Sequence, residues 1–154
     1  MVARIRRAEP ADKAELAKLR ALLWPEITPT DNRAEIDRYF MSEGSGFLPT
    51  VIFVSQNEGG TLTGFVEVGV RSHADGCDPT RPVGFIEGWF VCKSSRNQGI
   101  GKQLMLAAED WVRARKCKEM ASDALIDNLD SQQAHEHTGF EVVDRCVHFR
   151  KSLR

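Results

Sequence analysis

One stretch near the middle of the chain constrains its fold most: an apolar run, a polar loop and two glycines that open a helical pattern. The apolar run spans residues 83–91, and the glycines are Gly99 and Gly101. Glycine lets backbone N–H groups approach an anion, which the N-terminus of a helix also favours. The spacing fits neither a dinucleotide-binding loop nor a P-loop, and glycines one residue apart also occur in plain turns. The stretch therefore predicts a buried strand, a candidate phosphate loop and a helix over residues 99–116.

Length and charge bound the class of protein. The chain has 154 residues, 42% of them hydrophobic and 28% charged, which is ordinary for a soluble globular protein. The formal net charge of −1 offers no basic footprint for nucleic acid or a membrane surface. No apolar run approaches the roughly 20 residues that span a bilayer, and the first residues lack the apolar core of a signal peptide. We expect a single domain, 1–154, in the cytoplasm, with no nucleic-acid or membrane partner.

Cysteine and histidine spacing argues against disulfides and metal. The four cysteines lie far apart with no Cys-x-x-Cys pair, which predicts reduced structural thiols; they are Cys77, Cys92, Cys117 and Cys146. His135 and His137 are two apart in an expected helix, so they point to different faces. We expect no metal.

Hydrophobic periodicity gives the order of elements. Helices are expected to begin at residues 9–12, 31–32, 99 and 130–131, and three of them to end near Trp24, near Lys116 and before Gly139. Residues 42–49 should form a glycine-bearing loop, and residues 57–60 a hairpin turn. The expected strands are residues 2–7, 51–54, 63–70, 83–91, 120–123, 141–144 and 147–153. The order β-α-α-β-β-β-α-β-α-β-β makes a mixed α/β (α+β) domain.

This order, with Arg96-Asn97-Gln98-Gly99-Ile100-Gly101 between a strand and a long helix, resembles the GCN5-related N-acetyltransferases (GNAT). The resemblance narrows to the aminoglycoside 6′-N-acetyltransferase branch through residues 23–25, 75–78, 85–91, 119–123 and 147–151. It implies a GNAT-type domain with a mixed, mostly antiparallel central sheet flanked by helices. It also implies that acetyl-coenzyme A donates an acetyl group directly to the 6′-amine of an aminoglycoside antibiotic, conferring resistance, and that the protein is a homodimer.

The resemblance also implies roles for individual residues. The implied substrate contacts are Trp24, Glu87, Asp123 and Asp144. The implied coenzyme contacts are Trp89, Phe90 and Val91 on a strand edge, then Arg96, Asn97, Gln98, Gly99, Ile100, Gly101, Lys102 and Asn128. The chain departs from relatives at Ile27, where some have histidine, and in residues 71–75, which are one residue shorter. These departures leave the preferred set of drugs undetermined.

The candidate catalytic residues are Glu87, Asp123 and His135. Strand alternation places Glu87 on the same side as Phe85 and Trp89, and a carboxylate between aromatic rings is costly unless it is paired. The structural explanation is a salt bridge to an arginine such as Arg145 or Arg150. The functional one is an ammonium anchor or a general base, which attack by an amine requires.

The other candidates have structural alternatives too. His135 stands where many relatives have a tyrosine that acts as a general acid. It could have the same role, or it could equally be a solvated helix residue. Asp123 could cap a turn, and Trp24 could belong to the core. Apolar residues near the C-terminus (Val147, Phe149 and Leu153) could form a dimer seam or strand core.

Two other functions compete with aminoglycoside acetylation. Carboxylates would also suit acetylation of a polyamine or a protein amine. A noncatalytic coenzyme A-binding module is the remaining possibility.

Overall fold

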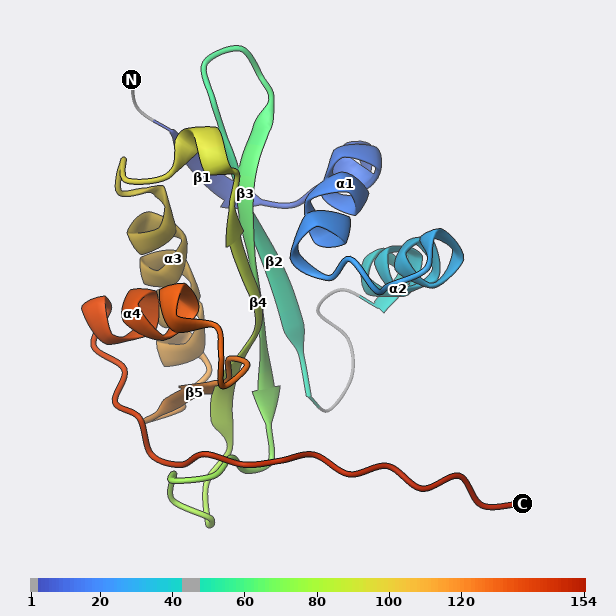
Figure 1. The fold of residues 1–154 in the computed structure, drawn as a ribbon. Helices are drawn as coiled ribbons and strands as arrows, with labels where there is room; N and C mark the ends of the chain where they lie inside the picture. The colour runs from blue at the N-terminus through green and yellow to red at the C-terminus, as the bar shows by residue number, and fades with distance from the viewer. Residues whose placement is uncertain (1–2, 43–47) are drawn as a thin grey trace.

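The structure, a computed structural model, describes residues 3–42 and 48–154. Its centre is a five-stranded sheet in the order β1-β2-β3-β4-β5, in which β1 to β4 are antiparallel and β5 runs parallel to β4 (Figure 1). The strands are β1 Arg4–Arg7, β2 Thr50–Gln56, β3 Leu62–Arg71, β4 Val83–Val91 and β5 Met120–Ser122. The helices are α1 Lys13–Leu23, α2 Pro29–Ser42, α3 Ile100–Ala114 and α4 Leu129–His137. Single 3-10 turns span Pro10–Asp12 and Lys93–Ser95. The predicted mixed, mostly antiparallel fold class is confirmed.

Helices cover both faces of the sheet. Helices α1 and α2 lie on one face and α3 lies on the other (Figure 1). One apolar cluster fills each face: α3 contributes residues such as Leu104 and Trp111, and the opposite cluster includes Leu16 and Ile36. The apolar side of this long helix therefore faces the core.

A β-bulge interrupts the pairing of β3 with β4. Glu67 lies opposite Gly88 and the next residue, Val68, lies opposite Ile86, so Glu87 is the extra residue. Bulges bend a strand and change the direction of its side chains. The bulge therefore lies at the candidate catalytic carboxylate.

This bulge overturns the expected side-chain alternation along β4. Ile86 and Trp89 both pack against the α3 cluster, although residues three apart on a regular strand point to opposite faces. Glu87 bonds to Arg71, whose guanidinium covers the ring of Phe85. The prediction that Glu87 shares a side with both Phe85 and Trp89 is thus wrong for Trp89, because the inserted residue shifts the alternation after Glu87.

The entry into α1 is fixed by one buried carboxylate. Asp12 receives hydrogen bonds from Arg6 Nη1 at 2.7 Å, Arg6 Nη2 at 2.9 Å and the Glu9 N–H at 2.7 Å. With Glu9, it also forms a capping box around the turn that precedes α1. The hydrogen bond from Arg6 is the main reason that the pKa of Asp12 lies below its ordinary value of 3.8.

We expect Asp12→Asn to lower the free energy of unfolding near neutral pH by about 1–3 kcal/mol, the cost of losing charge-assisted hydrogen bonds. Because the folded-state pKa is depressed, the ionised group stabilises the fold above its unfolded-state pKa. That contribution is lost as the pH falls through the folded-state value. Urea unfolding at about pH 7 and about pH 3 should show the two proteins converging at the lower pH. An equal difference at both pH values would contradict this account.

The second helix begins earlier than expected. Helix α2 starts at Pro29, and Thr28 Oγ1 accepts the N–H of Asp31 at 3.1 Å, so the predicted cap at residues 31–32 is wrong. Asn32 is instead buried, and its side chain accepts a hydrogen bond from Arg20. Proline suits a first helical position because it has no N–H to leave unpaired. Most of the predicted loop, residues 43–47, lies outside the described residues.

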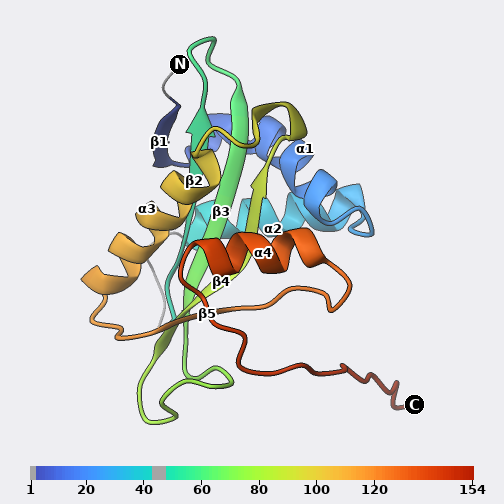
Figure 2. The ribbon, with the colours of Figure 1, turned by 60° about the vertical axis from the view of Figure 1, so that its left-hand side comes forward.

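The two strands expected at the C-terminus are absent. Residues 141–154 run as an exposed extended segment across one end of the sheet and away from the body (Figures 1 and 2). A strand requires a partner edge, and no strand of residues 3–42 or 48–154 pairs with this segment. Its apolar side chains are left uncovered; Phe149, for example, is 93% exposed. The prediction of strands at 141–144 and 147–153 is therefore wrong for one copy of the chain.

No helix in the described part of the chain is both long and apolar enough to cross a membrane.

Candidate functional site

The centre of the candidate site is the free edge of β4. Strand β5 pairs with β4 only as far as Ile86, opposite Ser122, so residues 87–91 have no strand on that side among those described. Trp89, Phe90 and Val91, the predicted coenzyme contacts, lie in this unpaired length. A strand edge presents N–H and C=O groups to an extended ligand.

The loop after β4 reaches the N-terminus of α3 through left-handed backbone. Asn97 has φ 62° and Gly99 has φ 81°, a region in which glycine is unstrained. Among residues 3–42 and 48–154, no atom beyond its chain neighbours and the α3 backbone lies within 4 Å of the position that a Cβ on Gly99 would take. The next three residues (Ile100, Gly101 and Lys102) form the first turn of α3, so their N–H groups have no preceding helical carbonyl to bind. This arrangement can receive an anion.

Arg96 is anchored to the strand rather than to the loop. Its Nε donates to the carbonyl oxygen of Val91 at 2.9 Å, and its guanidinium lies 5.6 Å from the centre of the Phe90 ring. Arg96 therefore fixes the geometry of the turn that follows β4.

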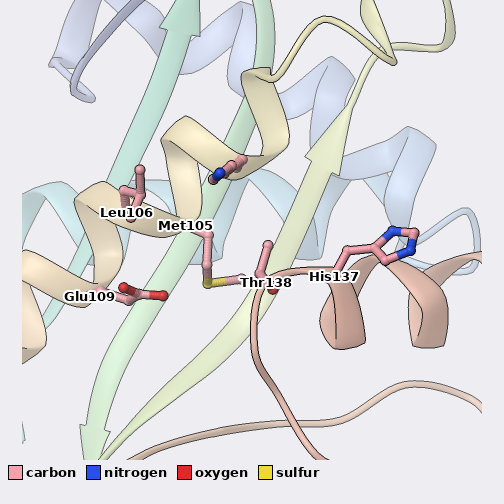
Figure 3. A pocket seen from close by; sticks show the side chains of 6 residues that line it. Met105, Leu106, Glu109, His137 and Thr138 are labelled. Carbon is pink, nitrogen blue, oxygen red and sulfur yellow. The ribbon is translucent and has the colours of Figure 1, made fainter.

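Trp89 connects the strand edge to α3 and α4. Its Nε1 donates to the carbonyl oxygen of Gly101 at 3.1 Å, and its ring meets the ring of His135 edge-on at 5.2 Å. A depression of about 110 Å³ lies between the two helices and is lined by Lys102, Met105, Leu106, Glu109, His137 and Thr138. Figure 3 shows Met105 directed towards Thr138 across this gap, while His137 points away from it.

His135 is held on all sides. Its Nδ1 lies 2.7 Å from the carbonyl oxygen of Ser131, and its Nε2 lies 2.7 Å from Ser122 Oγ. A carbonyl can only accept, so Nδ1 carries the proton, and in the neutral ring Nε2 accepts from the Ser122 hydroxyl. The ring also packs edge-on against Phe140. The alternative that His135 is a solvated helix residue is wrong, because this part-buried ring has partners on both nitrogens.

Trp24 lies over β4 on the opposite face of the sheet. A Cβ on Gly88 would stand 2.6 Å from a carbon of the Trp24 indole, so only glycine fits beneath this ring. The ring also contacts Phe65 edge-on at 6.1 Å and lies 4.8 Å from the guanidinium of Arg20. Trp24 is half-buried, so it belongs partly to the core and partly to the surface beside the bulge.

Glu87 is paired with Arg71. Arg71 Nε and Nη2 donate to its two carboxylate oxygens at 2.9 and 2.7 Å, and the Glu87 side chain is 33% exposed. The expected structural alternative, a salt bridge, is thus present, but the partner is Arg71 rather than Arg145 or Arg150. Both members of the pair remain accessible to solvent.

The other implied contacts fall in two places. Asp123 is exposed and directly follows Ser122, the last residue of β5, which pairs with Ile86 of β4. Asn128 caps α4 by accepting the N–H of Ser131 at 3.1 Å. Asp144 lies in the extended tail and accepts only the N–H of Arg145, at 2.7 Å, within the described residues. The structure therefore places Trp24 and Glu87 together at the bulge, Asp123 just after the end of β5, and Asp144 in the tail.

Comparison with known proteins places the chain in a family. The family model that matches is described as "Acetyltransferase (GNAT) family", and it covers residues 16–140. This chain belongs to the GNAT family. Aminoglycoside N(6′)-acetyltransferases type 1 from Klebsiella aerogenes and Stenotrophomonas maltophilia are 36% and 35% identical to it over 97% of this chain. The similarity covers 96% and 93% of those two proteins.

Solved structures agree with this placement. The GNAT chain is similar to AAC(6′)-Iy in complex with a bisubstrate analogue, with a TM-score of 0.89 and 30% identity over 99% of this chain and all of the other. AAC(6′)-Ih from Acinetobacter baumannii is similar with a TM-score of 0.86 and 26% identity over 99% of both chains. The resemblance to this family and to its aminoglycoside branch is confirmed.

The sequence did not reveal two polar groups that this GNAT protein places beside the bulge. Arg71 pairs with Glu87, and Glu67 on β3 pairs with the buried Arg20 of α1 at 2.5 Å. The one available signal was a lone glutamate in the apolar run of residues 62–71.

The cysteines are all unpaired, as expected. Burial raises the pKa of the thiols of Cys77, Cys92 and Cys117, which keeps them protonated and poorly nucleophilic. Among residues 3–42 and 48–154, no cluster of His, Cys, Asp and Glu could hold a metal ion.

Proposed function

We propose that this GNAT protein is an acetyl-coenzyme A-dependent aminoglycoside 6′-N-acetyltransferase that confers resistance, working as a single domain over residues 1–154. The observation that carries the proposal is the free edge of β4. A helix start that can receive an anion follows this edge, Glu87 lies where the edge begins, and Asp123 follows the last residue that β5 pairs with β4. The names of the relatives support the same substrate pair.

The donor half of the proposal assigns acetyl-coenzyme A to the loop and the strand edge. The pyrophosphate is received by the N–H groups of the loop and first turn, over Asn97, Gln98, Gly99, Ile100, Gly101 and Lys102, with Arg96 holding the turn in shape. The pantetheine arm lies along Trp89, Phe90 and Val91. Asn128 contributes its free amide N–H₂, because its side-chain oxygen is already used to cap α4.

The acceptor half assigns the aminoglycoside to the bulge. The drug carries several ammonium groups, and Glu87 and Asp123 offer carboxylates to bind them. Trp24 supplies a flat wall against a sugar ring. Asp144 joins this set only if the tail is placed differently from its position in one copy of the chain.

The chemistry follows from the arrangement. A primary amine is largely protonated near neutral pH, and a carboxylate such as Glu87, directly or through water, accepts its proton. The neutral nitrogen attacks the thioester carbonyl, a C–N bond forms, and the C–S bond breaks. Backbone N–H groups of residues 89–91 stabilise the oxyanion. After the C–N bond forms, the nitrogen still carries a proton to lose, and this proton passes to the departing thiolate through water or through the Ser122–His135 pair acting as a relay.

One assay tests this function against its competitors. Release of free thiol from acetyl-coenzyme A is followed with kanamycin, spermidine and a lysine peptide in parallel. We expect rapid release with kanamycin and formation of the 6′-N-acetyl product, identified by mass spectrometry. Release only with spermidine or the peptide would assign a different acceptor class. No release with any amine, together with coenzyme A binding, would indicate a noncatalytic module.

We further propose that the protein is a cytoplasmic homodimer. The tail of residues 141–154 keeps apolar residues in contact with solvent, and the similarity to AAC(6′)-Iy covers 99% of the chain and so includes this tail. Pairing with a second copy would give the tail the strand partner that it lacks. Such pairing would also allow Asp144 of the tail to lie close to an acceptor site of the dimer.

Phe149→Glu tests the dimer directly. A charge at this position would be buried in the seam, so we expect the variant to elute as a monomer while the unchanged protein has about twice the 17.3 kDa chain mass. Light scattering coupled to size exclusion gives both masses. Met41→Glu is the matched control, because Met41 is also an exposed apolar residue, 87% exposed, but belongs to α2 rather than to the tail. A dimeric Phe149→Glu variant, or a monomeric unchanged protein, would contradict the proposal.

A further inference from the structure

A buried arginine lies beneath the acceptor side of the sheet. The side chain of Arg20 is only 4% exposed, and its Nε donates to Asn32 Oδ1 at 2.9 Å. Its two terminal nitrogens bond to carboxylates, Nη1 to Glu67 at 2.5 Å and Nη2 to Glu35. Its guanidinium also lies 4.8 Å from the ring of Trp24. The buried guanidinium of Arg20 therefore helps to position Trp24, a candidate substrate contact, and the carboxylates of Glu67 and Glu35.

The two carboxylates differ in where they lie. Glu35 is on α2, and its side chain is 47% exposed. Glu67 is on β3 directly opposite Gly88, and its side chain is 21% exposed. Only one of its oxygens, Oε2, is hydrogen-bonded within the described chain, by Arg20. By contrast, Arg71 occupies both oxygens of Glu87.

We propose that Glu67 is a further acceptor-binding residue, whose second carboxylate oxygen receives an ammonium or hydroxyl group from the ring that carries the reacting amine. The inference rests on the proposed function. It adds a carboxylate on β3 to the substrate-binding residues that the family resemblance implies.

The position of Glu67 supports this assignment. Neighbouring strands lie about 4.8 Å apart, so Glu67 is one strand removed from the free edge where the thioester is placed. Trp24 covers Gly88, the residue opposite Glu67, and Glu87 is next along β4. Burial raises the pKa of Glu67, and the nearby Glu87 and Glu35 raise it further, while Arg20 opposes them. An arriving cation would relieve this cost of holding a charge there.

Paired substitutions separate contact with the acceptor from support of Arg20. Glu67→Gln and Glu35→Gln each remove one charge next to the guanidinium of Arg20, but only Glu67 lies on the central sheet, in β3. We expect Glu67→Gln to weaken kanamycin binding to the coenzyme A-saturated protein about 10-fold or more, and to raise the kanamycin KM to match. The KM for acetyl-coenzyme A should stay within about twofold in both variants. Glu35→Gln should bind kanamycin as the unchanged protein does.

Titration calorimetry with kanamycin, and with the two-ring fragment neamine, measures the binding. The loss in Glu67→Gln should persist with neamine, because the proposed contact is to the first ring. Glu67→Asp keeps the negative charge but moves it back by one methylene, so this variant should also bind kanamycin more weakly. It provides a second test if Glu67→Gln folds poorly. Equal losses in Glu67→Gln and Glu35→Gln, or unchanged binding in the Glu67 variants, would overturn this inference alone. Failure of the unchanged protein to bind either compound would overturn the proposed function with it.

Discussion

Gly99→Val should raise the KM for acetyl-coenzyme A about 100-fold or more. The native φ of 81° is strained for a β-branched residue by about 1–3 kcal/mol, and lost phosphate hydrogen bonds cost a similar amount each. Apart from its chain neighbours and the backbone of α3, no atom of the described residues lies within 4 Å of the position that the new Cβ would take. The added side chain therefore stands in the space from which a pyrophosphate reaches the first turn of α3. Steady-state kinetics at saturating kanamycin measure the KM.

Gly60→Val is the matched control for this prediction. Gly60 has φ 86° in the turn between β2 and β3, so valine there carries the same kind of backbone strain. Gly60 does not line the depression that this turn forms with Gln98 and Ile100. We expect both variants to lose similar unfolding free energy, while only Gly99→Val changes the coenzyme KM. If Gly60→Val raises that KM equally, the effect comes from general destabilisation. The loop would then lose its assignment as the phosphate site.

The parts of the fold that depend on neighbouring residues were predictable from sequence. The strand Val83–Val91 has the predicted bounds, and the helix after the glycine loop begins one residue later than expected. Proline, glycine and acidic residues at the ends of helices act on backbone within one turn, so a short window contains the whole signal. The end of α1 before Pro25 and the hairpin at residues 57–60 follow the same rule.

The side-chain arrangement at the site was not predictable in this way. Arg20 and Glu67 are 47 positions apart, and the bulge at Glu87 depends on the register of β3 against β4. Neither appears in the local pattern of either segment. Alternation therefore placed Trp89 on the wrong face, and the choice between several arginines named the wrong partner for Glu87.

The prediction of two strands in residues 141–154 was wrong for a different reason. The apolar content of this tail is what strands commonly contain, but a strand also needs an edge to pair with. In the described chain no strand pairs with residues 141–154. The apolar residues of the tail indicate that it packs against some surface, but they do not indicate which one. We propose that this surface belongs to a second copy of the chain.

Glu87→Gln should lower kcat about 100-fold or more, the usual contribution of a general base. Glutamine has the shape of glutamate but cannot accept the proton that the attacking amine has to lose. The variant should keep its stability to within about 1 kcal/mol, because the bond to Arg71 is a partly exposed ion pair. Stopped-flow or steady-state release of thiol measures kcat, and urea unfolding measures stability.

Arg71→Gln separates the base from the ion pair. It breaks the same pair of hydrogen bonds, at 2.9 and 2.7 Å, but leaves the Glu87 carboxylate in place. If Glu87 acts as the base, this variant should retain kcat to within about tenfold, since it loses positioning alone. Equal losses of kcat in the two variants would instead show that the pair is needed as a unit to shape the bulge. Proton removal would then fall to Asp123, which follows the last residue of β5, and Asp123→Asn would become the decisive substitution.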